Sequence, residues 1–474
     1  MQTDAIFWRV VMKDTIAAIS TAYGRGGVAM IRISGDEAIN IAERVFNAVS
    51  GKKLYETPSN LSVYGNILKG GRKIDDGMCT VFRSPHSYTG EDTVEICCHG
   101  GIILTETVLE AVYEAGAVPA GPGEFTKRAF INGKLSLSQA EAVGMIIDAE
   151  SKEQLALASS HQSGVMKKKS DELYERLKTV VTGVYANVDF PDEDLAELSS
   201  DQVLHELTSL SDELTRLRNS YKVGRAVLEG IPTVLAGKPN TGKSSLLNRL
   251  VGRERAIVTD VAGTTRDTIE ETVSCGRILL RLCDTAGIRE TDDKVEKIGV
   301  ERSVKNLDEA ELILAVFDLS RHFDSDDERL VEYIKNTNGI KIAVLNKNDL
   351  HPVFEEENIR KSDIFSHYVY LNASCEDDFQ SGVEKLKELI CSLYISGEID
   401  YSQNAVVTNA RQNSAVSGAL DCIERARAAL ESGLSADTAG FDLEEALSEL
   451  SELDGRRVTE EIVDGIFHRF CVGK

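Results

Sequence analysis

An eight-residue segment, Gly237-Lys238-Pro239-Asn240-Thr241-Gly242-Lys243-Ser244, has the residue types and spacing of a phosphate-binding loop. Its glycines permit a tight turn in which backbone N–H groups point at phosphate oxygens. The ammonium of Lys243 would reach the β- and γ-phosphates, and the hydroxyl of Ser244 would bind Mg²⁺. The segment therefore predicts a site for a nucleoside triphosphate.

Three later segments supply the other parts of a guanine-nucleotide site. Gly263-Thr264-Thr265-Arg266-Asp267 offers a hydroxyl for Mg²⁺ in a loop that could order around the γ-phosphate, and Asp284-Thr285-Ala286-Gly287 adds a carboxylate. In Asn346-Lys347-Asn348-Asp349, the carboxylate can accept hydrogen bonds from N1–H and the exocyclic amine of guanine, a pattern that adenine lacks. Each segment alone could be a turn or a helix cap. Together and in this order they predict a GTPase.

One expected part is missing, because Ile288 stands where Ras-like enzymes carry the glutamine that orients the attacking water. Either hydrolysis is slow or another group positions the water. The acidic candidates just downstream are Glu290, Asp292, Asp293 and Glu296. No arginine finger is evident, although Arg266 and Arg289 stay open as candidates.

The surrounding elements must bring these segments together. Short apolar, β-branched runs alternate with helical stretches between residues 230 and 390, which indicates a parallel sheet covered by helices. The predicted strands are Pro232 to Ala236, Ile278 to Cys283, Leu312 to Asp318, Lys341 to Leu345 and Tyr368 to Leu371. The motifs begin where strands end, which is where open α/β sheets bind ligands.

Helical patterns lie on both sides of this α/β region. The apolar stripes are Val203, Leu207, Leu210, Leu214 and Leu217 on one side, and Leu443, Leu447, Leu450 and Leu453 on the other. Because the ends of a domain usually lie close together, one domain can be inserted into another. We therefore expect an α/β GTPase domain over 226–395, inserted into an all-α domain made of 135–225 and 396–474.

Residues 12–134 form a third predicted unit, richer in glycine and turn signals. Strand-like runs such as Val28 to Ile33 and Thr93 to Cys97 favour an α+β fold. The overall prediction is a multidomain protein with α/β and α+β parts. Residues 1–11 have no obvious place in it, so Met12 is a candidate start.

The composition of the chain bears on its partners and its cell compartment. The formal charge of −24 argues against a protein that wraps nucleic acid by itself, so a tRNA or DNA role would need a local basic patch or a basic partner. No apolar run is long enough to span a membrane, and no signal peptide is apparent. The nine cysteines lack the spacing of a disulfide framework or zinc site. We expect a cytoplasmic protein without a membrane role.

Motifs outside the GTPase region carry a family resemblance. They are Asp14-Thr15-Ile16-Ala17-Ala18, Gly24-Arg25-Gly26-Gly27, Arg32-Ile33-Ser34-Gly35, Tyr88-Thr89-Gly90-Glu91-Asp92, His99-Gly100-Gly101, Pro122-Gly123-Glu124-Phe125-Thr126-Lys127-Arg128-Ala129-Phe130 and the terminal Phe470-Cys471-Val472-Gly473-Lys474. Over essentially its whole length, the chain resembles the MnmE (TrmE) family of tRNA-modification GTPases. A ribosome-assembly GTPase would have no reason for these motifs.

The resemblance implies that the N-terminal domain dimerises and binds 5-formyl- or methylene-tetrahydrofolate. Arg32, Glu95 and Lys134 match positions that contact the folate, and Lys474 matches a lysine near it. Cations suit the glutamate tail of a folate, and a carboxylate suits the donor groups of a pterin. Read from sequence alone, Arg32 and Lys134 could equally be surface charges.

For the GTPase domain, the resemblance implies activation by K⁺ in place of an arginine finger. Asn240 matches a K⁺ ligand, with further oxygens from Thr259, Val261 and Thr264, while Ser244 and Thr265 would hold Mg²⁺. Glu296 matches the water-orienting glutamate and would be the catalytic residue. The full predicted GTP-binding set is Asn240, Thr241, Gly242, Lys243, Ser244, Ser245, Thr259, Asp260, Val261, Ala262, Gly263, Thr264, Thr265, Asp284, Thr285, Ala286, Gly287, Asn346, Lys347, Asp349 and Ala373.

The resemblance further implies a homodimer that works with the flavoprotein MnmG, in a heterotetramer, on the wobble uridine of certain tRNAs. The pair would add an aminomethyl or carboxymethylaminomethyl group to carbon five, using a one-carbon unit from methylenetetrahydrofolate. Most tRNA contacts would come from the partner. A rival interpretation, a folate-dependent aminomethyltransferase with an incidental nucleotide domain, would need no partner.

Two departures from the family pattern bear on the guanine site. Asn372-Ala373-Ser374 stands where Ser-Ala-Lys is usual, so base contacts there rest on the backbone of Ala373. Asn348 occupies a position where serine or alanine is common. Cys471 matches a family cysteine and is more readily read as a free thiol in a tail than as a nucleophile.

Overall fold

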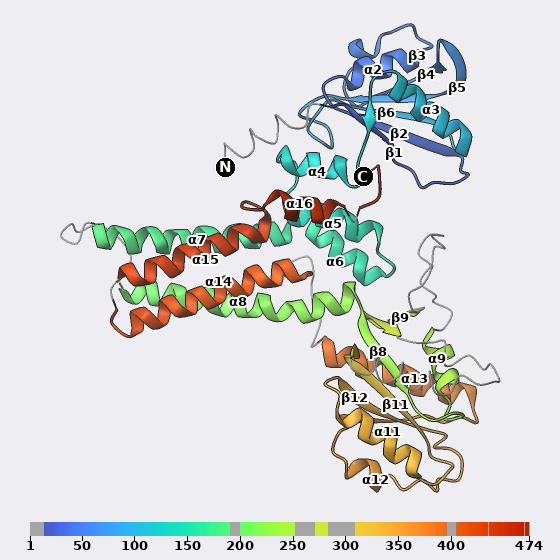
Figure 1. Ribbon diagram of the computed structural model, residues 1–474, viewed down its shortest axis with the longest axis vertical. Helices are drawn as coiled ribbons and strands as arrows, with labels where there is room; N and C mark the ends of the chain where they lie inside the picture. Colours follow the sequence, from blue (N-terminus) through green and yellow to red (C-terminus); the bar gives the residue numbers. More distant parts are fainter. Residues whose placement is uncertain are drawn as a thin grey trace. The chain divides into compact units, whose positions relative to one another are not determined.

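The computed structural model describes residues 14–189, 200–251, 271–282, 309–395, 404–434, 436–468 and 470–473. They form two compact units, and Figure 1 colours the elements of both along the chain. The described residues of Met1–Ile147, Ala158–Leu214 and Ser414–Lys474 make the first unit, and those of Asp148–Leu157 and Thr215–Asn413 make the second. No helix in these described ranges combines the length and apolar character that a membrane crossing requires.

The first unit begins with a seven-stranded, mixed sheet in the order β3-β4-β5-β6-β2-β1-β7. Its strands are β1 (Ile16–Ile19), β2 (Val28–Ser34), β3 (Phe46–Ala48), β4 (Leu61–Lys69), β5 (Arg72–Phe82), β6 (Thr93–His99) and β7 (Val118–Pro119). Neighbouring strands run antiparallel, except that β1 and β7 are parallel. Strands β2 and β6 lie at the centre in a register that pairs Arg32 with Glu95.

One face of this sheet is covered and the other stays more open. Helices α2 (Ala38–Val45) and α3 (Ile102–Glu114), with the short 3-10 helix η1 (Leu54–Glu56), pack on the first face. Residues that alternate along the strands, such as Ile31, Ile33 and Ile96, are fully buried there. Arg32 and Glu95 point to the opposite face because successive side chains of a strand alternate.

Helices make up the rest of the first unit. They are α4 (Glu124–Ile131), α5 (Leu137–Ile147), α7 (Val165–Asp189), α15 (Ala436–Asp454) and α16 (Glu460–Phe467). Helix α15 packs along α7, and α16 packs on α4, so segments from the two ends of the chain share one core. Three further helices contribute residues to both units: α6 (Lys152–Gln162), α8 (Ser200–Leu228) and α14 (Ala410–Glu431).

The second unit contains a six-stranded sheet in the order β13-β12-β11-β8-β10-β9. Its strands are β8 (Ile231–Ala236), β9 (Glu271–Cys275), β10 (Ile278–Leu282), β11 (Leu312–Asp318), β12 (Ile340–Asn346) and β13 (His367–Tyr370). All neighbours run parallel except the β9–β10 hairpin. The carboxyl ends of β8, β11 and β12 therefore meet at one edge of the sheet.

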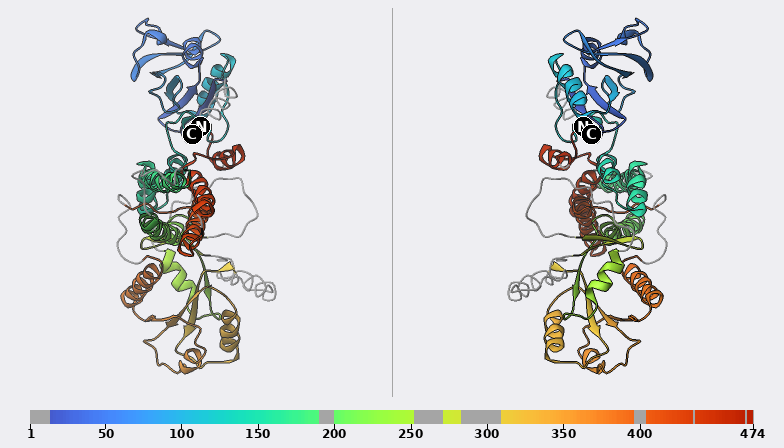
Figure 2. Two further views of the ribbon diagram at one scale, coloured as in Figure 1. Left: turned by 90° about the vertical axis from the view of Figure 1, so that its left-hand side faces the viewer. Right: turned by 90° about the vertical axis from the view of Figure 1, so that its right-hand side faces the viewer.

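Helices cover both faces of this sheet, as Figure 2 shows with α13 and α11 on opposite sides. The helices are α9 (Lys243–Val251), α11 (Ser325–Lys335), α12 (Glu357–Arg360) and α13 (Glu376–Tyr394). The buried residues of β11 alternate between the two cores, with Leu314 on the α13 side and Phe317 on the α11 side. Such double coverage explains why the first six residues of β11, up to Phe317, are all apolar.

The predicted elements can now be compared with the observed ones. Strand β11 has the predicted bounds, and the other four predicted strands of the α/β region differ from β8, β10, β12 and β13 by one or two residues at their ends. The first leucine stripe is buried in α8. In the second stripe, Leu443, Leu450 and Leu453 are buried in α15, whereas Leu447 is half-buried.

Candidate functional site

The predicted phosphate-binding loop joins the end of β8 to the start of α9, at the edge where the parallel strands end. Its glycines are structurally required. A Cβ on Gly237, at φ +156°, would lie 2.5 Å from the carbonyl oxygen of Val316, and a Cβ on Gly242, at φ +98°, would lie 2.0 Å from Asn346 Nδ2. Only glycine allows the loop to lie this close to β11 and β12.

The side chain of Lys243 reaches back to the start of the loop. Its Nζ donates to the carbonyl oxygens of Gly237 at 2.7 Å and Lys238 at 2.6 Å, and the Thr241 hydroxyl donates to the Lys238 carbonyl at 2.9 Å. Burial, and then the charge of Arg321, lower the pKa of Lys243 from 10.5 to about 8. The ammonium is thus held within the loop by backbone carbonyl oxygens, an arrangement that suits an incoming phosphate.

The predicted base-recognition segment is bonded directly to the phosphate loop. Asn346, at the end of β12, donates from Nδ2 to the Thr241 carbonyl oxygen at 2.8 Å. Lys347 Nζ donates to the neighbouring carbonyl of Asn240 at 3.2 Å and to Asp318 Oδ2 at 2.6 Å. Residues 105 positions apart in sequence therefore fix one another.

Asp349 and Ala373 also meet, as expected for two residues that would read one base. Asp349 accepts from the backbone N–H of Ala373 at 2.6 Å and of Ser374 at 2.7 Å. Desolvation raises the pKa of Asp349, but these two donors outweigh it and the net pKa is lowered. Asn348 Nδ2 lies 3.3 Å from Asn372 Oδ1, so two of the three residues that depart from the family pattern contact each other.

A cavity of about 1260 Å³ lies beside these segments and is lined by Gly242, Ser245, Asn346, Lys347 and Ala373, among others. Asn240 and Ser244 lie on the exposed side of the same loop. The structure thus brings together every described member of the predicted nucleotide site. The remaining predictions, Thr259, Asp260, Val261, Ala262, Gly263, Thr264, Thr265, Asp284, Thr285, Ala286, Gly287 and Glu296, lie outside the described residues.

A second cluster lies on the open face of the N-terminal sheet. Arg32 on β2 and Glu95 on β6 form an ion pair at 2.8 Å, with side chains 16% and 17% exposed. The Arg32 guanidinium lies 5.5 Å from the ring centroid of Tyr88 and 5.6 Å from that of Phe125. Two of the four predicted folate ligands, Arg32 and Glu95, are therefore paired with each other, and the guanidinium of Arg32 also lies close to two aromatic rings.

Lys134 contacts the same loop that carries Tyr88. Its Nζ donates to the Pro85 carbonyl oxygen at 2.9 Å, and Tyr88 is fixed by a 2.9 Å hydrogen bond between its hydroxyl and that of Thr126. Lys134 is exposed, in contrast to the half-buried Arg32.

The C-terminal tail lies on the N-terminal sheet domain. Val472 forms a β-bridge with Pro122, and the Ser20 hydroxyl donates to the Gly473 carbonyl at 3.1 Å. A Cβ on Gly473 would lie 2.1 Å from the Ile19 carbonyl oxygen, which explains the glycine. Lys474 follows directly and lies outside the described residues, while Cys471 is exposed.

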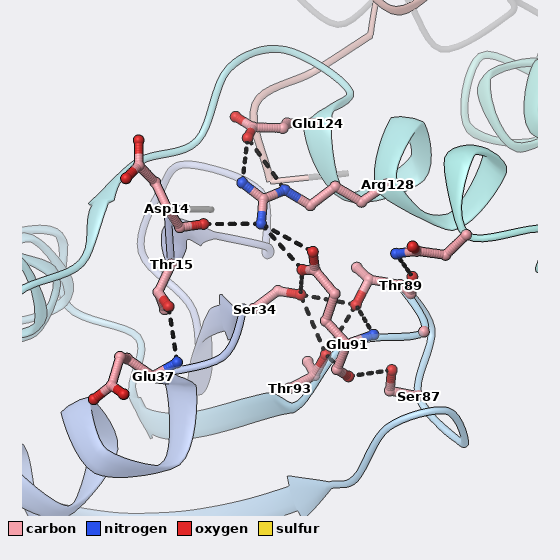
Figure 3. A network of polar contacts seen from close by, with 12 residues as sticks. Asp14, Thr15, Ser34, Glu37, Ser87, Thr89, Glu91, Thr93, Glu124 and Arg128 are labelled. Atoms are coloured by element: carbon pink, nitrogen blue, oxygen red, sulfur yellow. Dashed lines mark hydrogen bonds and ion pairs between the residues drawn. The ribbon is translucent and has the colours of Figure 1, made fainter. Parts of the chain in front are cut away.

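A buried polar network, drawn in Figure 3, supports this second cluster and was not predicted. Arg128 is 2% exposed and bonds Glu91 at 3.1 Å, Glu124 at 2.8 Å and the Asp14 carbonyl at 2.9 Å. Ser34 donates to Glu91 at 2.8 Å. The signal was present, because these residues lie in motifs quoted above, but nothing in the sequence indicates which of them pair.

Comparisons with known proteins agree over nearly the whole chain. Residues 15–134 match the family model for the GTP-binding protein TrmE N-terminus, and residues 137–471 match that for the MnmE helical domain. The chain is 41% identical over 463 residues to the tRNA modification GTPase MnmE of Clostridioides difficile (strain 630), and 42% identical over 462 residues to that of Lachnoclostridium phytofermentans. Each match covers 97% of this chain and 99% of the relative.

Among solved structures, the chain is similar to Aquifex aeolicus Era bound to GDP and AlF4⁻, at 26% identity over 40% of this chain and 65% of that one. The TM-score of 0.26 is too low to add to the assignment. The predicted architecture is confirmed: an N-terminal TrmE domain precedes a helical domain into which a P-loop GTPase-like domain is inserted. From these matches, the chain belongs to the MnmE family of tRNA modification GTPases, enzymes that bind and hydrolyse GTP.

Proposed function

We propose that this GTPase is activated by K⁺ and that, with the flavoprotein MnmG, it forms the 5-carboxymethylaminomethyl or aminomethyl group on the wobble uridine of certain tRNAs. The one-carbon unit comes from methylenetetrahydrofolate. The observation that carries the nucleotide part is a pair of hydrogen bonds, which Asn346 and Lys347 donate to consecutive carbonyl oxygens of the phosphate loop. It supports a single guanine-nucleotide site built before the nucleotide arrives.

The oxygen donors of the phosphate loop suit the two proposed cations. Ser244, with Thr265, would hold Mg²⁺, and Asn240, with Thr259, Val261 and Thr264, would hold K⁺. Hydroxyl, amide and carbonyl oxygens are the donors that such hard cations prefer. When bound, K⁺ would neutralise charge that develops on the phosphates, the task of an arginine finger elsewhere. Asn240 is exposed at φ +62°, a left-handed conformation that asparagine tolerates better than most residues.

The chain's own residues divide the remaining work. Lys243 binds the β- and γ-phosphates from within the loop, and Asp349 with the Ala373 N–H reads the guanine edge. Each carboxylate oxygen of Asp349 accepts one backbone N–H, which leaves further acceptor sites for the guanine donors. Glu296 orients the attacking water. Thr285, Ala286 and Gly287 complete the switch after Asp284.

The paired Arg32 and Glu95 support the folate part of the proposal. A guanidinium paired with a carboxylate can bond the polar edge of a pterin, and the two aromatic rings close to that guanidinium can stack on its plane. Lys134 and Lys474 would bind the acidic glutamate tail. The position of Gly473 beside Ser20, next to the β1–β2 pair that includes Arg32, supports a role for the tail.

The proposed partners follow from charge and family. A chain of net charge −24 is poorly suited to bind tRNA alone, so MnmG would supply most tRNA contacts within a heterotetramer built on a homodimer. We place the domain boundaries at 12–134, 135–225, 226–395 and 396–474.

The test is to delete the gene and analyse tRNA nucleosides by mass spectrometry. We expect loss of the wobble-uridine modification, and recovery when the native gene is returned. Recovery should fail with a Glu95→Gln copy but succeed with a Glu106→Gln copy, because Glu106 lies in α3, where it accepts an exposed hydrogen bond from the Tyr23 hydroxyl. Unchanged wobble uridines in the deletion strain would refute the modification role.

A further inference from the structure

Lys347 links an acidic residue of β11 to the proposed K⁺ ligand. Its Nζ donates to Asp318 Oδ2 at 2.6 Å and to the Asn240 carbonyl oxygen at 3.2 Å. Asp318 is nearly buried, with its side chain 8% exposed, and its Oδ1 accepts from the backbone N–H and hydroxyl of Ser320. The acid is thus fixed on both oxygens, and Lys347 is fixed by the acid.

Two backbone conformations depend on this link. Asn240 has φ +62° and Lys347 has φ +59°, both in the left-handed region that is unfavourable for most residues other than glycine. Lys347 bonds the carbonyl of Asn240, and Asn346 bonds the carbonyl of Thr241. Because Lys347 holds the peptide group that follows the Cα of Asn240, the backbone that carries the Asn240 side chain is held on that side.

Charge gives a second reason for Asp318 to matter. The ammonium of Lys347 lies against the same residue that would donate to K⁺, and two cations so placed repel each other. Asp318 neutralises this ammonium. Desolvation raises the pKa of Asp318, but its hydrogen bonds to Lys347 and Ser320 outweigh this effect, and the net pKa is lowered. The carboxylate therefore stays charged at neutral pH.

We propose that Asp318 is a positioning residue for the proposed K⁺ site: through Lys347 it holds Asn240 in the cation-binding conformation and removes the competing charge. This inference rests on the proposed activation by K⁺. It predicts that loss of Asp318 weakens the apparent affinity for K⁺ while leaving hydrolysis at saturating K⁺ close to native.

The experiment is a KCl titration of steady-state GTP hydrolysis by the full-length protein, at saturating GTP and at constant ionic strength maintained with NaCl. For Asp318→Asn, we expect the half-activating K⁺ concentration to rise about tenfold, the effect of losing one hydrogen bond to a charged group. Asp318→Glu, which keeps the charge, should fall between this variant and the native protein. Asp326→Asn is the matched control, since Asp326 is exposed in the same region and lies 3.7 Å from Arg329.

The outcomes separate this inference from the proposed function. If native hydrolysis does not respond to K⁺, the proposed function fails and this inference fails with it. If native hydrolysis responds and Asp318→Asn keeps the native half-activating concentration, the inference alone is wrong. A thermal melt and the affinity for a fluorescent GDP analogue show whether the variant is folded. If Asp318→Asn is unfolded, Asp318→Glu is measured in its place. A half-activating K⁺ concentration equal to the native one in Asp318→Glu would then refute the inference.

Discussion

The side-chain amide of Asn346 donates to the carbonyl oxygen of Thr241 at 2.8 Å, which ties the segment that would read the base to the loop that would hold the phosphates. Asn346 is 2% exposed. A single buried contact thus connects the two halves of the proposed nucleotide site.

Asn346→Ala should therefore weaken nucleotide binding. Loss of the donor leaves a carbonyl of the phosphate loop unpaired, at a cost of about 1 to 3 kcal/mol, so the dissociation constant for GDP should rise about 5- to 150-fold. Titration with a fluorescent GDP analogue measures this. Asn348→Ala, which removes only the exposed 3.3 Å contact to Asn372, should change affinity far less. Equal effects of the two substitutions would contradict the role of the bond from Asn346 to Thr241.

Gly242→Ala should abolish nucleotide binding, because its Cβ would lie 2.0 Å from Asn346 Nδ2 at φ +98°. Gly276→Ala is the control within the same unit. It also imposes a left-handed residue, at φ +63°, but its Cβ would meet only an ordinary contact 3.6 Å from Cys391 Sγ. Both variants should lose about 1 kcal/mol of unfolding free energy to backbone strain, and only Gly242→Ala should lose the nucleotide. Nucleotide binding by Gly242→Ala would disprove the steric requirement.

Nucleotide binding should be coupled to proton uptake at alkaline pH. Burial lowers the pKa of Lys243 to about 8 in the nucleotide-free protein, and phosphate oxygens would raise it again. Calorimetric titrations with GDP in two buffers of different ionisation enthalpy should show uptake of close to one proton near pH 9 and almost none at pH 6.5. In Lys243→Arg, which is always protonated, the uptake should vanish.

The same shift makes a prediction for the free protein. Because the unfolded lysine titrates near 10.5 and the folded one near 8, the unfolded state binds more protons between these values. The contribution of Lys243 to unfolding free energy therefore rises with pH through this window. Chemical denaturation at pH 8 and pH 10 should show a smaller rise in Lys243→Arg than in the native protein. An identical pH dependence would show that Lys243 titrates normally.

Breaking the network around Arg128 should strongly destabilise the N-terminal domain. Arg128→Ala leaves Glu91 and Glu124 without their buried partner, at a cost of about 3 to 5 kcal/mol. Lys69→Ala removes solvent-screened pairs with Glu110 and Glu114 and should cost far less. Thermal melts of the two variants compare these costs. Similar melting temperatures would mean that the network contributes little.

The central α/β elements are predictable because burial leaves a strong pattern. All seven residues of β11 are buried, and the first six form an unbroken apolar run that ends at Asp318. Strand β9 escaped prediction because it is a short edge strand with polar residues, Glu271-Thr272-Val273-Ser274-Cys275. In the β4–β5 hairpin, Gly65 and Gly77 face each other and interrupt the apolar alternation.

Some residues of the candidate site are likewise predictable from a local pattern, and others are not. Residues of the phosphate loop are recognisable because the chemistry needs a fixed local spacing. The bonds from Asn346 to Thr241, from Lys347 to Asp318 and from Arg128 to Glu91 join distant segments through side chains. No local pattern records such partners, so only the folded chain reveals them.

The most direct test of the central claim compares GTP hydrolysis in KCl and in NaCl at equal ionic strength. We predict faster turnover of the native protein in KCl. Asn240→Ala should lose this stimulation, and Asn240→Lys, which supplies an ammonium at the position of the cation, should be independent of K⁺. Equal rates of the native protein in the two salts would contradict activation by K⁺.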